Sequence, residues 1–229
     1  MRDFLASSHQ PRGLEKGTIV TEAGLAAPPT ITATGSRLSG GAVLGAVIAG
    51  IAWAVSGVTA VIYPEWDVGI TRPYYVIEGT HAVAETAMIP ALLLLWSAQR
   101  TRLHRPGNFG FGLAVAATAL MAVITYGSVI VPLLGITEEN LVVTVLFLVS
   151  VLGWVVGFIM CGIATIRARV WPPVTGPLLI AHPLLGLAIL ASYELWESYA
   201  LFTAVGVLWF AVVWILSART RSDRREQHA

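Results

Sequence analysis

Hydrophobic residues in this sequence gather into six long runs separated by short polar segments. The runs cover residues 40–63, 74–96, 111–134, 141–164, 174–192 and 198–216. Each holds about twenty residues, and a helix rising about 1.5 Å per residue then crosses a hydrocarbon core about 30 Å thick. None of the runs alternates apolar and polar residues, as strands of membrane barrels do. The pattern predicts an all-α fold, a polytopic integral membrane six-helix bundle.

The polar segments divide the chain into three regions. We expect 1–38, which is rich in polar residues, Pro and Gly, to be a disordered cytoplasmic tail. It lacks the apolar core of a secretory signal peptide. Residues 39–217 form the expected six-transmembrane-helix domain, and 218–229 a basic cytoplasmic tail.

Basic residues indicate how the helices are oriented. Thirteen of the fourteen Lys and Arg residues lie in the tails or after the second and fourth runs, and Arg72 is the exception. The opposite segments carry Glu65, Asp67, Glu138 and Glu139. Cytoplasmic segments of membrane proteins are enriched in Lys and Arg. Six crossings with both termini in the cytoplasm therefore fit the sequence.

Composition supports a chain that mostly avoids water. Hydrophobic residues make up 56% and charged residues 12%, against about 25% charged in soluble domains. The net charge of +1 gives no indication of nucleic-acid binding. The single cysteine, Cys161, excludes an intrachain disulfide and a cysteine zinc cluster. One Lys against thirteen Arg suggests a GC-rich bacterial genome, and hence a bacterial inner membrane.

An Arg-x-Arg motif follows every second run, at 100–102, 167–169 and 219–221. Three duplicated hairpins would leave such an echo. We favour the interpretation that these arginines are membrane anchors, whose long side chains extend to the lipid headgroups.

Two rows of small residues have the four-residue spacing that brings membrane helices close together. We interpret them as packing contacts within the chain. They are Gly41, Gly45 and Ala49 in the first run, and Gly153, Gly157 and Cys161 in the fourth.

Ionisable side chains inside the runs are the candidate functional residues, because each costs several kcal/mol in lipid unless it is paired or hydrated. Glu78, His81 and Glu85 share one face of the second predicted helix, within about 60°. Glu85 would lie about 14 Å below the outer boundary and His81 about 8 Å. His182, in the fifth run, would lie about 11 Å from the level of His81, so the two histidines are not expected to share a metal ion.

Glu194 and Glu197, between the fifth and sixth runs, extend the candidate site at the outer boundary. A di-iron site would need a second Glu-x-x-His pair besides Glu78 and His81, so neither a metal nor another cofactor is predicted. Two interpretations of the cluster remain open. It lines an outward-open pocket for a polar or cationic ligand or a proton relay, or Glu85 pairs with a histidine and the cluster serves packing alone.

Three functions follow from these interpretations. The leading hypothesis is a non-enzymatic protein that binds a small apolar or cationic ligand, senses it, or assists a transporter through an outward-facing polar pocket. The alternative is an intramembrane acid–base enzyme of the isomerase or cyclase type, acting on a lipid or isoprenoid. In it a protonated Glu85 would donate a proton, and Glu194 or Glu197 would accept one. The third is a structural subunit of a membrane complex. The pattern indicates no oligomeric state.

Overall fold

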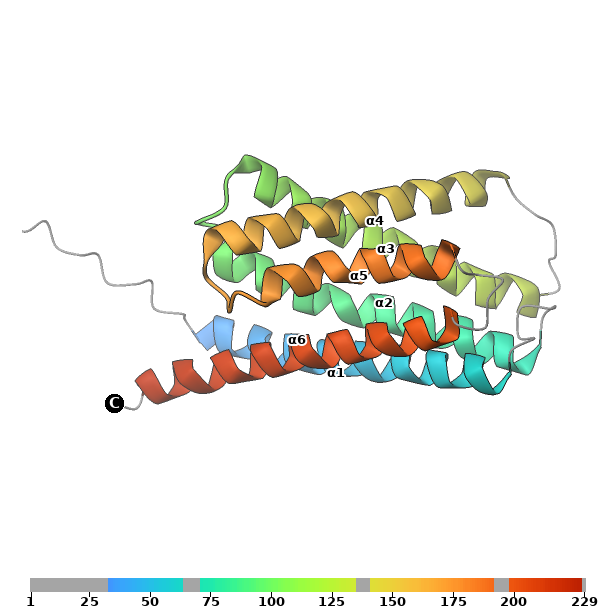
Figure 1. Ribbon diagram of the computed structural model, residues 1–229, viewed down its shortest axis with the longest axis horizontal. Coiled ribbons are helices and arrows are strands. Elements are labelled where there is room, and N and C mark those ends of the chain that lie inside the picture. Colours follow the sequence, from blue (N-terminus) through green and yellow to red (C-terminus); the bar gives the residue numbers. More distant parts are fainter. Residues whose placement is uncertain (1–32, 64–70, 135–140, 192–197, 228–229) are drawn as a thin grey trace, which may run out of the picture. The chain divides into compact units, whose positions relative to one another are not determined.

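Six helices account for nearly all of the chain that the computed structural model describes, which is residues 33–63, 71–134, 141–191 and 198–227 (Figure 1). All of these residues belong to the unit Thr32–Ala229. The helices are α1 (Ala33–Ile62), α2 (Arg72–Gln99), α3 (Arg105–Leu133), α4 (Leu141–Ala168), α5 (Thr175–Ala191) and α6 (Ser198–Gln227). The predicted all-α class is confirmed.

Four of these helices are long and apolar enough to cross a membrane. They contain the segments Gly40–Ile62, Arg72–Gln99, Arg105–Leu133 and Leu141–Ala168. Helices α5 and α6 contribute the shorter apolar segments Thr175–Ile189 and Thr203–Ala218. The chain therefore has the features of a membrane protein. The number of crossings and their orientation stay predictions at this point.

The helices are arranged as a ring in chain order. Each packs against the next along the chain, and α1 also packs against α6. Successive helices run in opposite directions, as Figure 1 shows. Every helix thus has two helical neighbours and turns a third side toward the centre of the ring.

Glycines set the distance between several neighbouring helices. A Cβ atom on Gly45 would lie 2.5 Å from the carbonyl oxygen of Ala87, so α1 touches the backbone of α2 there. A Cβ atom on Gly157 would lie 2.6 Å from the backbone nitrogen of Ala114 in α3. The predicted packing role is confirmed for these two residues. It is wrong for Gly41, which is exposed and whose added Cβ would meet no atom within 4 Å.

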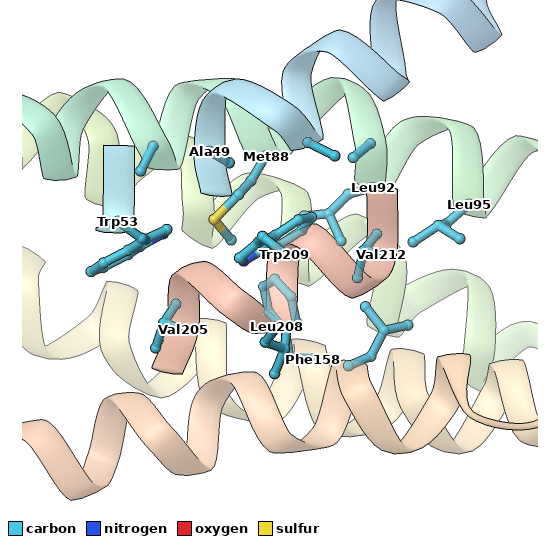
Figure 2. Close-up of a cluster of buried hydrophobic side chains, with 14 of the residues drawn as sticks. Ala49, Trp53, Met88, Leu92, Leu95, Phe158, Val205, Leu208, Trp209 and Val212 are labelled. Carbon is cyan, nitrogen blue, oxygen red and sulfur yellow. The ribbon is translucent and has the colours of Figure 1, made fainter. Parts of the chain in front are cut away.

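Large apolar side chains fill the centre of the ring. Figure 2 shows Met88 and Leu92 of α2, Phe158 of α4 and Trp209 of α6 in one cluster. Trp209 is the largest of the fully buried side chains in the described residues, with an exposed fraction of 0%. Trp214, five positions later in α6, is 71% exposed and faces outward. The buried cluster fills the middle of the bundle. Glu78, His81 and Glu85 precede Met88 and so lie nearer the start of α2.

Candidate functional site

The polar face predicted on α2 meets two different neighbours. Glu78 and Glu85 form hydrogen bonds with α3, whereas His81 forms one with α1. The three residues share one face of the helix within about 60°, but that face lies between two flanking helices. A small angular difference is therefore enough to send His81 to one side and the carboxyl groups to the other.

Both carboxyl groups are bound by hydroxyl groups of α3. Ser128 Oγ donates to Glu78 Oε2 at 3.2 Å. Thr125 Oγ1 donates to Glu85 Oε2 at 3.0 Å. The two hydroxyl residues are three positions apart, so they lie on the same side of α3. The deeper carboxyl meets the earlier α3 residue, as expected when the two helices are antiparallel.

Each hydroxyl also has a backbone acceptor within reach. Thr125 Oγ1 is 3.0 Å from the carbonyl oxygen of Met121, and Ser128 Oγ is 2.7 Å from the carbonyl oxygen of Thr125. A hydroxyl carries one proton, so it can satisfy only one of its two acceptors fully. A carboxyl group that carries a proton removes this competition, because it donates to the hydroxyl oxygen while the hydroxyl donates to the backbone. A bound cation between the oxygens would do the same.

No basic side chain pairs with these carboxyl groups among the described residues. The hydrogen-bond partner of Glu85 in that part of the chain is Thr125, and that of Glu78 is Ser128. A buried carboxylate without a counter-charge is costly in lipid. Neither ring nitrogen of His182 has a hydrogen-bond partner in the part of the chain that the structure describes, so the predicted pairing of Glu85 with His182 is not formed there.

Tyr74 fixes the α2–α3 contact beside Glu78. Its hydroxyl donates to the carbonyl oxygen of Ser128 at 3.2 Å. The same Ser128 therefore binds Tyr74 through its backbone and Glu78 through its side chain. This double contact sets the register of the two helices at the start of α2.

His81 is held by α1. Its Nε2 lies 2.6 Å from Ser56 Oγ, and its ring lies 4.7 Å from the ring of Trp53, centroid to centroid. Its contacts thus differ from those of Glu78, although the two form the Glu-x-x-His pair noted in the sequence. No group of three His, Cys, Asp or Glu side chains in the described ranges is placed to hold a metal ion.

His182 lies apart from the carboxyl groups, in a cage of aromatic rings. The centroids of Trp154 and Phe158 are each 4.8 Å from its own, and that of Trp209 is 5.6 Å away. Its exposed fraction is 1%, and neither ring nitrogen has a hydrogen-bond partner in the described part of the chain. This histidine therefore belongs to the packed centre.

Two of the predicted site residues, Glu194 and Glu197, fall outside the described residues. Conversely, the structure adds Thr125, Ser128 and Ser56, which the sequence does not predict as site residues. Their signal in the sequence is a single hydroxyl residue inside an apolar run, which is weak because such residues commonly bond their own helix backbone.

Comparisons with protein families, with curated proteins and with solved structures found no match to this chain.

Proposed function

We propose that the chain crosses a bacterial inner membrane six times, with both termini in the cytoplasm. The apolar segments of α5 and α6 pack into the same ring as the four longer helices, which supports counting them as spans. At about 1.5 Å per residue, the 17 residues of α5 extend about 26 Å, close to the thickness of a hydrocarbon core. The distribution of Lys and Arg supports the orientation.

Reporter fusions test this orientation. A fusion at Gly69 is expected to be active only with an enzyme that folds outside the cytoplasm. A fusion at Arg102 is expected to fluoresce with a protein that folds inside it. Fusions reporting the same side for both positions would contradict the crossing of α2 and remove the physical basis of the site.

We further propose that Glu78 and Glu85 of α2, at the contact with α3, bind a small cation from the outer side, the proton being the simplest. The chain would then serve as a sensor or as an accessory protein of a transporter. One observation carries this proposal: Glu85 lies in an apolar helix, accepts a hydrogen bond from Thr125, and has no cationic partner in the described part of the chain. Such a group either holds a proton or attracts a cation.

The spacing of the two carboxyl groups suggests how the ligand would arrive. Glu78 lies seven positions before Glu85, on the same side of α2 and about 10 Å nearer the start of the helix. Each group has its own hydroxyl partner on α3. A proton entering at the start of α2 would reach Glu78 first and Glu85 second.

The rival hypotheses have less support. A structural subunit would turn the polar face of α2 toward another protein, whereas these side chains form hydrogen bonds with α1 and α3. The enzyme hypothesis stays a prediction, because its second carboxyl group, Glu194 or Glu197, lies outside the described residues.

Infrared difference spectra between acidic and alkaline buffer test the cation site in the purified protein. We expect a carboxyl C=O band that titrates in the wild type and is absent from Glu85→Gln. Thr125→Val should shift that band, because it removes the hydroxyl partner of Glu85 and leaves a side chain of similar shape.

Two matched variants act as controls. Glu78→Gln and Ser128→Ala alter the neighbouring carboxyl and its hydroxyl, so they should leave the Glu85 band in place. The proposal fails if wild type and Glu85→Gln give the same spectra and if Na⁺ or Ca²⁺ stabilises both proteins equally against heat.

A further inference from the structure

A second polar feature lies at the opposite end of α2, where two of the Arg-x-Arg motifs come together. A cavity of about 300 Å³ opens between the start of α3 and the end of α4. Arg102 from the first motif and Arg167 from the second both line it, together with His104. Anchoring at the membrane surface explains why these arginines lie at this end of the bundle. It does not explain why two of them line the same cavity.

The cavity has a charged side and an apolar side. Arg102, His104 and Arg167 are exposed to solvent, and none of the lining residues is acidic. Leu103 and Met160 belong to the apolar lining. The size is at the lower end of the range of small-molecule sites, which runs from about 300 to 1,000 Å³. It therefore suits a compact anionic group with a short apolar attachment.

Hydrogen bonds fix the positions of the helix ends that surround the cavity. Gln99 Nε2, at the end of α2, donates to Thr165 Oγ1 of α4 at 3.0 Å, and both side chains are buried. Trp96 Nε1 donates to Asn108 Oδ1 at 2.8 Å, and Asn108 Nδ2 donates to the carbonyl oxygen of Leu103 at 3.3 Å. These bonds connect the end of α2, the start of α3 and the end of α4 with the segment that carries Arg102. The two arginines therefore lie on parts of the chain that are held in fixed positions.

The N-terminus of α3 lies at the cavity, where its helix dipole favours a bound anion. Its N-cap residue, His104, makes no side-chain capping hydrogen bond, and Pro106 and Gly107 in the first turn line the cavity. The first backbone N–H groups of a helix favour an anion. This contribution supplements that of the arginines.

An apolar path leads from the cavity along α4. Ile163 lines the cavity and is 41% exposed. Val156 and Leu152, also exposed, follow it toward the middle of the helix on the same side, within about 40°. An acyl chain lying on this stripe would place its headgroup at the arginines. Free phosphate would make no use of the stripe.

We propose that this cavity binds the phosphate group of an anionic phospholipid, with one acyl chain lying along α4. The guanidinium groups of Arg102 and Arg167 would bind the phosphate oxygens, for which their planar fork of donors is suited. Basic pockets between helices at the cytoplasmic surface are a known means of holding anionic headgroups.

Native mass spectrometry of the purified full-length protein tests the proposal, with phosphatidylglycerol and phosphatidylcholine of identical acyl chains as probes. We expect the wild type to bind phosphatidylglycerol about thirtyfold more tightly, since each of the two arginines contributes about 1 kcal/mol near an anionic headgroup and about 1.4 kcal/mol is tenfold. The double variant Arg102→Gln/Arg167→Gln should lose most of this preference while eluting as wild type in gel filtration.

A double variant of equal charge gives the control. Arg100→Gln/Arg105→Gln removes two exposed arginines of the same segment that do not line the cavity, and it should keep the preference. Equal losses in both double variants would mean diffuse surface charge and would overturn the proposal. Absence of any preference in the wild type would also overturn it. So would displacement of the lipid by inorganic phosphate at the same concentration.

Discussion

Trp209→Ala is expected to destabilise the bundle by about 3 kcal/mol or more, the lower end of the cost of removing a buried aromatic side chain. Trp209 is fully buried and packs against His182 at the centre of the ring. Its Nε1 has no hydrogen-bond partner in the described part of the chain, so the truncation removes packing alone. Helices in lipid associate largely through such packing. The measurement is the fraction of monodisperse protein that remains after heating in detergent.

Trp214→Ala is the matched control, because it removes the same side chain from the outward side of the same helix. Trp214 is 71% exposed, and its truncation should change stability by no more than about 0.5 kcal/mol. Equal losses in the two variants would show that α6 does not turn the Trp209 face toward the centre.

Gly157→Ala is expected to destabilise the protein by up to about 2 kcal/mol, the usual overpacking cost of about 1–3 kcal/mol less the helix propensity that alanine gains. The new Cβ would lie 2.6 Å from the backbone nitrogen and 2.8 Å from the Cα of Ala114. Backbone atoms cannot rotate away, so α3 and α4 would have to separate along their contact. The contact is with backbone, which places the overpacking cost above the gain of about 1 kcal/mol that alanine brings to a helix. The same heating assay gives the result.

Gly127→Ala tests whether the effect comes from the contact. Gly127 also lies within a helix, α3, but an added Cβ there would meet no atom within 4 Å. This variant should be neutral or slightly more stable than wild type. If Gly157→Ala proved as stable as Gly127→Ala, the register of α3 against α4 would be wrong.

The helices themselves could be predicted because length and apolarity are enough to define a membrane helix. Their order around the ring could not. Apolar residues occur on all sides of these helices, so no stripe marks the inward face. The small residues gave a partial indication, since Gly45 and Gly157 do lie at helix contacts. Gly50 and Gly206 form a comparable contact between α1 and α6, and no spacing in the sequence links them.

The candidate site was predictable only in its charged members. Glu78 and Glu85 stand out because a carboxyl group inside an apolar helix needs an explanation. Thr125 and Ser128 do not, because hydroxyl groups in helices usually bond their own backbone. The helical wheel placed His81 with the carboxyl groups, but the neighbour that each side chain meets depends on the crossing of three helices. That crossing is a tertiary property.

The contact between α1 and α6 has a consequence for biosynthesis. The two helices are the first and the last of the six described helices, yet Gly206 touches the backbone of Gly50 and Ala54. The ribosome must finish all the intervening segments before this seam can form. Until then the side of α1 that packs against α6 has no helix against it. Formation of the α1–α6 contact therefore completes the six-helix ring, and a chain truncated before α6 would lack this contact.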